Sequence, residues 1–517
     1  MSTSNRNLEA TWRYHDATKH SYESVRTNPH FLDWSNRPRP LKLYPALEPL
    51  PLPRDLPQTN VPALAALAPG PVPAGDVVPE LSTLAHIFYF SAGITKRKTY
   101  PVGEFLFRAA SCTGALYEIE LYLVCGDLPG LAAGVYHFNP GDFALRQLRR
   151  GDYRGAVVRA TAAEPAVASA PALVICTGIY WRNAWKYQAR TYRHFGWDNG
   201  TLLANLLAGC AAWSLPAKLV CGFVDSEVNH LLGLDTEREV AFSMVALGRV
   251  ASPPPEPPAN LPPLNLETVP YSPREADYPS MREMHAASCL HSPQEVAAWH
   301  GPAAVADSPP PTGRLIPLAV PPEDQLPRDS LEAVVLRRGS SRKFAQEAIS
   351  FTQLSTLLHS ASQGLPADFL EPPGTRLNQW YLIVHAVNDL PSGLYRFHPE
   401  RSALELLREG SFRSDAYYLG LEQELPGDAS VAVFFLADLG RILERFGNRG
   451  YRATQLEAGL LGGRLYLAAY AQRLGATGLT FYDDDVVQFF APHADGLSAI
   501  FLMAIGQSAK SRLVGLR

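Results

Sequence analysis

The sequence predicts an α+β protein that contains two tandem copies of one domain. Three observations support this: an internal repeat, two helical stretches that are apolar on nearly all sides, and a proline-rich segment between the copies. The chain has 517 residues, 46% hydrophobic and 19% charged, which suits a folded protein of about three domains, or two larger domains with extensions. The net charge of −4 argues against a general nucleic-acid or polybasic membrane surface.

The repeat is clearest in two segments that lie 259 positions apart. Gly134 to Arg154 (GVYHFNPGDFALRQLRRGDYR) and Gly393 to Arg413 (GLYRFHPERSALELLREGSFR) share ten of 21 residues. Within one position of this offset, LYLV at 121–124 aligns with YLIV at 381–384, and VALG at 245–248 aligns with MAIG at 503–506. A repeat of this length indicates duplicated domains, because solenoid units recur every 20 to 50 residues.

The elements are expected in the same order in each copy. A helical stretch leads to the LYLV-type strand, the GVYHF or GLYRF strand follows, and a second apolar strand starts at Ala172 or Val431. A helix with almost no polar face comes next, from Gly200 in one copy and Ala458 in the other, before the strand that ends in VALG or MAIG. Such helices must be covered all round, so we expect them to form the buried seam between the copies.

Proline marks the segments outside the copies, with 45 prolines in the chain. We expect an extended proline-rich arm at 1–83 packed over the pair, a first domain at 84–250, a proline-rich linker at 251–328 and a second domain at 329–517. Polyproline segments are stiff spacers, so the linker is expected to carry the chain around a compact pair.

The six cysteines show no CxxC spacing, which predicts neither a zinc site nor a disulfide framework and favours a reducing cytoplasm. The N-terminus has no apolar signal core, and no run of about 18 apolar residues predicts a membrane span. His20, His30 and His194 lack ligand spacing, so no metal site is expected. Neither a GxGxxG turn nor a GxxxxGK[ST] loop is present.

Two basic clusters stand at opposite ends of the second copy. Arg338, Ser340 and Arg342 offer planar guanidinium donors and a hydroxyl that suit a phosphate, although a solvated basic helix start fits them equally well. Lys510 and Arg512 follow the last strand. Together the clusters resemble the FMN-binding pattern of the nitroreductase-like flavoproteins, which implies that these five residues grip the flavin phosphate.

A loop in the first copy carries the second part of the resemblance. The segment from Arg108 to Tyr117 (RAASCTGALY) is similar to the R-x-x-P-S-(S/A)-G-A-L-Y-P segment of the SagB/ThcOx-type dehydrogenases, a branch of that superfamily. Ser111 stands in place of the proline, and Cys112 and Thr113 in place of the small hydroxyl pair. The resemblance implies that Arg108, Ser111, Cys112 and Thr113 lie against the flavin ring. We expect Cys112 to be a packing residue rather than a nucleophile, because no base stands next to it.

The same branch carries a Lys-Tyr pair near the flavin, and Lys186 and Tyr187 match it. The resemblance makes Lys186, with Tyr187, the candidate catalytic base or its partner; the less favoured alternative is that both are interface residues without a chemical role. A base near neutral pH needs a lowered pKa, which burial or cations such as Arg190 and Arg193 would supply. Thr480 and Phe481 align with the segment that approaches flavin N5 in the family.

Two copies predict two possible flavin sites, and the resemblance indicates that only one is intact. The reciprocal clamp would be Lys19 to Glu23 in the arm, where Glu23 repels a phosphate, and the reciprocal loop, Pro372 to Leu377, has lost the pattern. We therefore expect one FMN per chain in an intramolecular pseudo-dimer. The acidic run that begins at Asp483 is expected to cap a helix start.

By resemblance, the function is that of an FMN-dependent oxidoreductase of the SagB/ThcOx type. Its substrate would be a small molecule or a peptide-derived intermediate that loses two electrons and two protons, with hydride passing to flavin N5. An NAD(P)H-dependent reductase of nitro compounds or quinones is an alternative, and a non-catalytic flavin-binding or scaffold protein is a third. Neither nucleic acid nor membrane is an expected partner, and self-association beyond the internal pair stays open.

Overall fold

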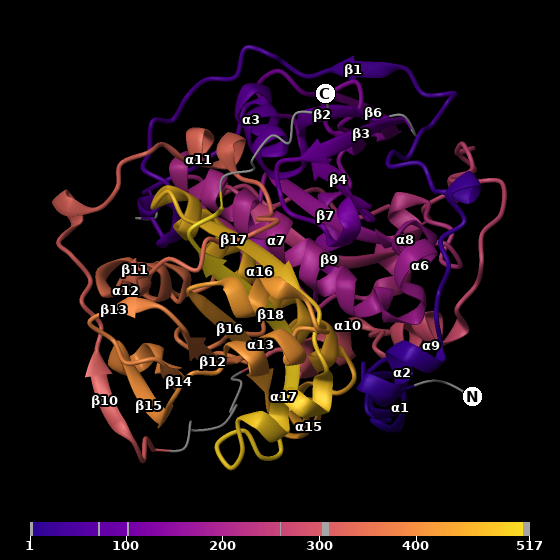
Figure 1. Cartoon of the computed structure of the whole chain (residues 1–517). Helices are drawn as coiled ribbons and strands as arrows, with labels where there is room; N and C mark the ends of the chain where they lie inside the picture. Colours follow the sequence, from indigo (N-terminus) through magenta and orange to yellow (C-terminus); the bar gives the residue numbers. More distant parts are fainter. Residues whose placement is uncertain (1–3, 71–72, 101–102, 259, 302–309, 510–517) are drawn as a thin grey trace.

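Two seven-stranded sheets with the same order of strands organise the chain (Figure 1). The computed structural model describes residues 4–70, 73–100, 103–258, 260–301 and 310–509. The first sheet has the order β1 (Pro49–Pro51), β6 (Ala144–Arg150), β5 (Gly134–Asn139), β4 (Ile119–Cys125), β7 (Ala172–Ile179), β9 (Glu239–Leu247) and β8 (Ala217–Val220). The second has the order β10 (Arg314–Pro317), β15 (Ala403–Glu409), β14 (Gly393–His398), β12 (Gln379–Val384), β16 (Val431–Ala437), β18 (Ser498–Gly506) and β17 (Gly475–Leu479). The predicted mixture of helices and sheets is confirmed.

The repeated sequence segments fall on equivalent strands of the two sheets. The segment that starts at Gly134 forms the β5–β6 hairpin, and the segment that starts at Gly393 forms the β14–β15 hairpin. The apolar strands β4, β7, β9 and β16 are buried along their whole length, as is β12 from its second residue on. All neighbouring strands within both sheets are antiparallel.

The helices of the two halves come in a similar order, except that the second half has an additional helix, α11 (Leu331–Arg337), at its start. In the first half these are α3 (Leu81–Ala92), α4 (Arg154–Ala160), α5 (Pro165–Ser169), α6 (Tyr180–Tyr187), α7 (Thr191–Ala212) and α8 (Asp225–Leu232). In the second half these are α11, α12 (Phe351–Ala361), α13 (Arg413–Leu419), α14 (Glu424–Asp428), α15 (Leu439–Phe446), α16 (Arg449–Ala471) and α17 (Asp483–Phe489). Two small two-stranded pairings complete the halves: β2 (Ile94–Tyr100) with β3 (Gly103–Arg108), and β11 (Ile349–Ser350) with β13 (Val387–Asn388).

The long helices α7 and α16 form the predicted seam and lie against each other between the two sheets (Figure 1). Glycines set their close approach. A Cβ on Gly200 would lie 2.3 Å from the backbone nitrogen of Leu460, and a Cβ on Gly459 would lie 2.4 Å from the carbonyl oxygen of Trp197. The absence of side chains there lets the backbones touch, which explains why these helices carry glycine where alanine is the better helix former.

We expect Gly200→Ala to lower the stability of the whole chain by about 3 kcal/mol or more, because the new methyl group meets backbone that cannot rotate away. The matched control is Gly209→Ala in the same helix, where the Cβ would lie 3.6 Å from a side-chain carbon of Ile87. That change should be neutral or gain up to about 1 kcal/mol of helix propensity. Thermal unfolding of the three proteins measures both effects, and equal melting temperatures would contradict the close packing.

The arm and the linker are partly built into the sheets. β1 from the arm extends the first sheet beside β6, and β10 from the linker extends the second beside β15. The arm also holds α1 (Glu9–Ala17) and α2 (Tyr22–Thr27), and the linker holds α9 (Pro279–Ala287) and α10 (Pro293–Trp299). Helix α1 packs on α9, so the two segments meet on one side of the molecule.

Two buried ion-pair clusters join the halves in a reciprocal way. Asp225 at the start of α8 accepts hydrogen bonds from Arg449 (2.6 Å) and Arg452 (2.9 Å) of α16. Asp483 at the start of α17 accepts hydrogen bonds from Arg193 of α7 (2.6 Å) and from Arg190 just before it (3.1 Å).

The charges in these clusters stay ionised. Burial alone would raise the pKa of Asp483, but Arg190 and Arg193 lower it to about 2. Asp483 begins α17, as predicted, but it does not cap the helix, because the N-cap is Tyr482 and makes no side-chain cap hydrogen bond. The Asp483 carboxylate is instead the counter-charge of the two arginines.

Within the described ranges, no helix is both long and apolar enough to cross a bilayer. All six cysteines are free thiols.

Candidate functional site

Arg338 joins the second half to the predicted loop of the first half. It follows α11, and its guanidinium donates hydrogen bonds to the carbonyl oxygens of Ala109 (2.8 Å) and Arg108 (3.3 Å). The guanidinium carbon lies 5.6 Å from the centre of the Tyr466 ring on α16. The basic cluster that begins at Arg338 therefore lies next to the Cys112 loop, at the junction of the two halves.

The rest of this segment runs along the edge of the second sheet. Ser341 donates its amide to the carbonyl of Ala476 in β17 (2.9 Å). The hydroxyls of Ser340 and Tyr466 lie 3.0 Å apart, and Tyr466 also accepts from the amide of Gly478 (2.8 Å). Tyr466 thereby links Ser340 to the strand that leads into Thr480.

The C-terminal end of the chain runs beside the same segment. The amide of Ala345 donates to Gln507, and the amide of Ala509 donates to Lys343 (3.0 Å). The end of the chain is therefore antiparallel to the basic segment as far as residue 509. Lys510 and Arg512, the other predicted phosphate ligands, lie outside the described residues.

Arg342 is exposed, and among the described residues it forms no ion pair with a carboxylate. Burial, and then the charge of Arg342, lower the pKa of Lys186. The expected cations Arg190 and Arg193 do not contribute to this shift, because Asp483 holds both. The cation that lowers the pKa of Lys186 therefore comes from the other half of the chain.

Tyr187 packs against Gly114 of the Cys112 loop. A Cβ on Gly114, whose φ is +62°, would lie 3.0 Å from the Tyr187 hydroxyl. The ammonium of Lys186 lies 5.2 Å from the centre of the Tyr187 ring, and the ring of His194 meets the same ring edge-on at 4.6 Å. Burial and the nearby acidic groups raise the pKa of Tyr187, so its hydroxyl keeps its proton.

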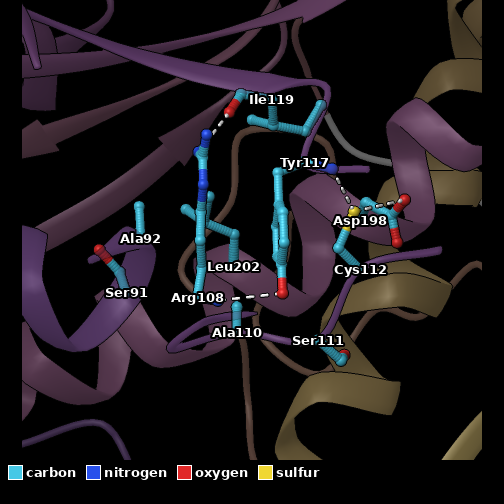
Figure 2. Close-up of a pocket in the computed structure, with 10 residues that line it drawn as sticks. All are labelled: Ser91, Ala92, Arg108, Ala110, Ser111, Cys112, Tyr117, Ile119, Asp198 and Leu202. Carbon is cyan, nitrogen blue, oxygen red and sulfur yellow. Dashed lines mark hydrogen bonds between the residues drawn. The ribbon is translucent and has the colours of Figure 1, made fainter. Parts of the chain in front are cut away.

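Behind the loop lies a group that the sequence did not predict: Cys112, Glu118 and Asp198 (Figure 2 shows Cys112 and Asp198). The Cys112 thiol lies 3.4 Å from a carboxyl oxygen of each acid. Asp198 accepts hydrogen bonds from the amide (2.8 Å) and hydroxyl (2.9 Å) of Thr113, so it fixes the loop from α7. A sequence signal existed, since Asp198 is the one acidic residue of a helix that is buried along nearly its whole length.

Burial raises the pKa of the Cys112 thiol, and the charges of Asp198 and Glu118 raise it further. Burial and Glu118 likewise raise the pKa of Asp198. A protonated thiol is a poor nucleophile, which favours the predicted packing role of Cys112. The cavity beside this group measures about 20 Å³, about the room of one water molecule.

Two other loop residues that were predicted to contact the cofactor, Arg108 and Ser111, make hydrogen bonds within the protein. Arg108 is 4% exposed and donates to the carbonyls of Pro40 (2.7 Å) and Ile119 (3.4 Å), so its guanidinium ties the arm to β4 (Figure 2 shows the bond to Ile119). The Arg108 guanidinium thus has a structural role here, in contrast to its predicted contact with a cofactor. Ser111 accepts a hydrogen bond at its carbonyl from Thr201 of α7 (2.8 Å).

Thr480 and Phe481 follow β17 at the same junction. The Thr480 hydroxyl is buried without a hydrogen-bond partner, and within the described part of the chain the amides of Thr480 and Phe481 donate to no protein group. Phe481 is fully buried against Trp197. These unpaired donors fit a ligand that carries acceptor atoms.

The reciprocal side of the seam is built differently. The pairing of Ala63 with Asp329 and of Val61 with Leu331 sets the arm opposite the start of α11. The 3-10 helix η2 (Ala65–Leu67) packs on α7 as α11 packs on α16. Residues 68–70, Ala-Pro-Gly, follow η2 and therefore correspond to Arg338 to Ser340, which follow α11.

The predicted reciprocal clamp, Lys19 to Glu23, is therefore wrong. Lys19 pairs with Asp16 and Asp484 near α17, and Ser21 caps α2. The cause of the error is the irregular arm, whose spacing does not follow the repeat.

On the reciprocal side, protein groups also pair with the backbone of β8 and of the residues that follow it. Pro366 accepts from Leu219 at the edge of β8, where the second sheet has Ser341 against β17. The Asp368 carboxylate accepts from the amides of Cys221 (2.9 Å) and Gly222 (2.8 Å), which follow β8 as Thr480 and Phe481 follow β17. The donors that are free on one side are satisfied by a carboxylate on the other.

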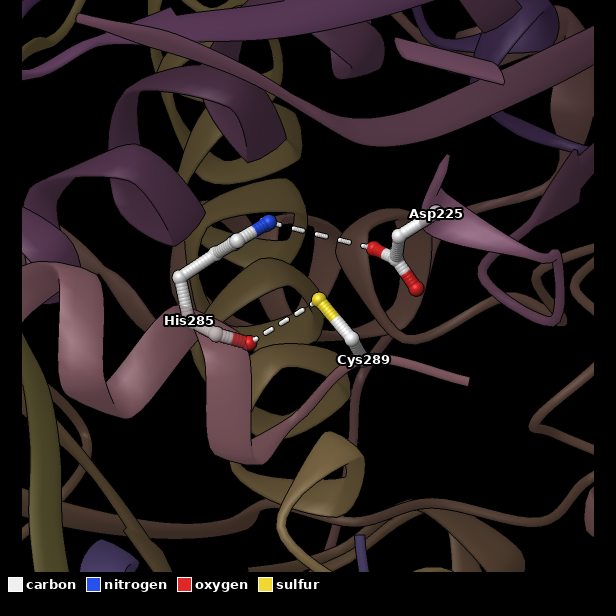
Figure 3. Close-up of side chains that lie close together, drawn as sticks. All are labelled: Asp225, His285 and Cys289. Atoms are coloured by element: carbon white, nitrogen blue, oxygen red, sulfur yellow. Dashed lines mark hydrogen bonds and ion pairs between the residues drawn. The ribbon is translucent and has the colours of Figure 1, made fainter. Parts of the chain in front are cut away.

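A second group with metal-ligand chemistry, Asp225, His285 and Cys289, lies inside the seam (Figure 3). Both carboxyl oxygens of Asp225 already accept from Arg449 and Arg452. A metal ion there would have to displace two buried guanidinium groups, so the group has the chemistry of a structural ion-pair network.

Comparisons with known proteins give the class first. Residues 335–506 match the model of the Nitroreductase family. The Methanocaldococcus jannaschii protein named "Putative nitroreductase MJ1384" is 25% identical over 162 residues, which cover 30% of this chain and 81% of the relative. These matches support the nitroreductase superfamily and an oxidoreductase.

A solved structure then extends the likeness to the whole chain. The crystal structure of a protein of the same designation from Anabaena variabilis ATCC 29413 is 24% identical, with a TM-score of 0.76 over 97% of this chain and 99% of that one. This likeness shows that the complete two-sheet fold occurs in another protein. A Ralstonia eutropha JMP134 structure, also designated a nitroreductase, covers 42% of this chain and 95% of its own, at 18% identity and a TM-score of 0.33.

Proposed function

We propose that the chain is an FMN-dependent oxidoreductase of the SagB/ThcOx-like type, with one flavin at the junction of its halves. The observation that carries the proposal is the contact of Arg338 with the Cys112 loop across the two halves. The charge of Arg342 in the second half also lowers the pKa of Lys186 in the first. These are the parts that the family resemblance requires, and they come from segments more than 150 positions apart.

The residues present fit the cofactor in this proposal. Arg338, Ser340 and Arg342 would hold the phosphate, with Lys510 and Arg512 as further proposed ligands. The loop of Ser111, Cys112 and Thr113 would lie against the ring, and the free donors of Thr480 and Phe481 would face its edge. Bound FMN would supply an acceptor for two electrons, which no side chain of the protein provides.

The chain's own part in the reaction is proton transfer and positioning. Lys186, whose pKa is lowered by burial and by Arg342, would take a proton from a substrate carbon as a neutral amine. Tyr187 keeps its proton and would orient the amine and the substrate by hydrogen bonding. The proposed substrate is a small molecule or a peptide-derived intermediate that is oxidised by two electrons, as when an azoline ring becomes an azole.

The proposal includes an intramolecular pseudo-dimer. In an isologous dimer each subunit gives the same contact that it receives. Arg449 and Arg452 hold Asp225 of the first half, and Arg190 and Arg193 hold Asp483 of the second. This reciprocity, together with the matching strand orders, supports a duplicated domain that pairs with itself.

The absorption spectrum of the purified chain, with its flavin-to-protein ratio after FMN loading, tests the proposal. We expect a flavin spectrum and a ratio close to one, because 68–70 lacks cations and Asp368 satisfies the amides on the reciprocal side. A ratio near two would contradict the single site. A colourless protein that takes up no FMN would favour the scaffold alternative.

A reductase that uses NAD(P)H and acts on nitro compounds or quinones is the second candidate. The designation of the relatives as nitroreductases favours it. Anaerobic mixing with NAD(P)H separates the two candidates, since rapid bleaching followed by turnover of a nitro compound indicates reduction. Slow bleaching combined with oxygen-dependent oxidation of an azoline peptide indicates the dehydrogenase.

A further inference from the structure

A cavity of about 190 Å³ lies on the reciprocal side of the seam. Its walls come from the C-terminal part of α7, the arm and the start of β8, and they are mostly apolar: Leu67, Ala204, Leu207, Ala208 and Leu215 are among them. Exposed Pro69 and Gly70 place one side of it at the surface.

One charged side chain, Arg464 of α16, lines this cavity, and it is 5% exposed. Its guanidinium donates to the carbonyl oxygens of Gln363 and Gly364 (3.4 Å). Neither partner carries a charge. Among the described residues, no carboxylate forms an ion pair with Arg464, in contrast to the other arginines of α16, Arg449 and Arg452, which share Asp225.

An uncompensated buried cation is costly, and proteins usually pair such a group. Burial is the cause that lowers the pKa of Arg464 to about 9, and no neighbouring acid raises it again. At neutral pH the guanidinium therefore stays charged. An anionic ligand at this position would supply the counter-charge that the chain lacks.

We propose that this cavity binds a small carboxylate with an apolar tail, its carboxylate against Arg464 and its tail along Leu207, Ala208 and Leu215. A planar guanidinium suits a carboxylate, and the walls suit a hydrocarbon chain. The volume exceeds that of a cavity that holds benzene, about 150 Å³, so a chain of several carbons can enter. One cation suits a monoanion better than a phosphate dianion, for which the other half assembles a cluster.

This inference does not depend on the proposed flavin site. The residues of the cavity are separate from Arg338, Lys186 and the Cys112 loop. A failure to bind FMN would leave it intact, and a failure to bind a carboxylate would leave the proposed oxidoreductase intact.

Isothermal titration of the full chain as purified with octanoate, and in parallel with octan-1-ol, tests the site. We expect octanoate to bind one per chain and at least tenfold more tightly than the alcohol, which has the same tail and no charge. Arg464→Met should lower octanoate affinity at least tenfold and leave the alcohol unaffected, while Arg464→Lys should retain most of the affinity. Arg473→Met, which removes an exposed arginine paired with Asp329, is the control and should bind octanoate as the parent does.

A second variant guards against misfolding of the Arg464 variants. Ala211→Phe should fill the cavity from α7, abolish binding of both ligands and leave the flavin-to-protein ratio unchanged. Equal affinity for octanoate and octan-1-ol, no binding of octanoate by the parent chain, or undiminished binding by Ala211→Phe would each overturn the proposal.

Discussion

Arg338→Ala is expected to lower the affinity of the chain for FMN by about 10- to 100-fold, since charge-assisted hydrogen bonds to a phosphate contribute about 1.5 to 3 kcal/mol. The variant should elute from gel filtration with far less than one flavin per chain. Fluorescence titration with added FMN measures the weakened binding.

The neighbouring arginine provides the matched control. Arg337 has the same charge, but it pairs with Asp329 (2.7 Å) and donates to the carbonyl of Tyr470 (2.6 Å). Arg337→Ala should therefore keep its flavin. Because Arg338 also holds the carbonyl of Ala109, the melting temperature of both apoproteins separates cofactor loss from unfolding. Full flavin content in both variants would contradict the assigned phosphate site.

Lys186→Ala should retain FMN and lose turnover by about 10²- to 10⁴-fold, the usual contribution of a general base. The flavin-to-protein ratio and the rate of substrate oxidation at saturating FMN measure the two properties separately. Lys218→Ala is the control, because Lys218 pairs with Glu164 and Glu371 at β8 and should leave the rate unchanged. Full activity of Lys186→Ala would remove Lys186 from the mechanism.

The pH profile of turnover gives a sharper test of Lys186. A base must be neutral to accept a proton, so the rate should fall as the pH drops through the pKa of Lys186. Arg342 lowers that pKa by its charge. Arg342→Gln should therefore raise the pKa and move the acid limb to higher pH, measured at saturating FMN because the variant also loses a proposed phosphate ligand. An unchanged acid limb would indicate that another group is titrated.

The strands and the seam helices could be predicted because their signals are local. The repeat aligns the sequence of β5 with that of β14, and both become the equivalent strand of their sheets. A helix without a polar face has to be buried on all sides. The edge strands β1 and β10 could not be predicted, since PLP and RLIP are short, proline-containing segments without alternation. They become strands only because β6 and β15 each present an open edge.

The sequence could predict which segments meet at the candidate site, but not which charged side chains pair there. The meeting of Arg338 with Ala109 follows from the family resemblance. The partners of Arg190 and Arg193 do not follow from it, because Asp483 lies about 290 positions away and reads locally as a helix start. The cation that acts on Lys186 was misassigned for the same reason.

The exchange of arginines between the halves has a consequence for the order in which the chain is made. When the first half has left the ribosome, Arg190, Arg193 and Asp225 have no counter-ions, since the charged groups that pair with them belong to sequence that has yet to be translated. We therefore expect that the first half cannot complete its folding until the second half has been synthesised.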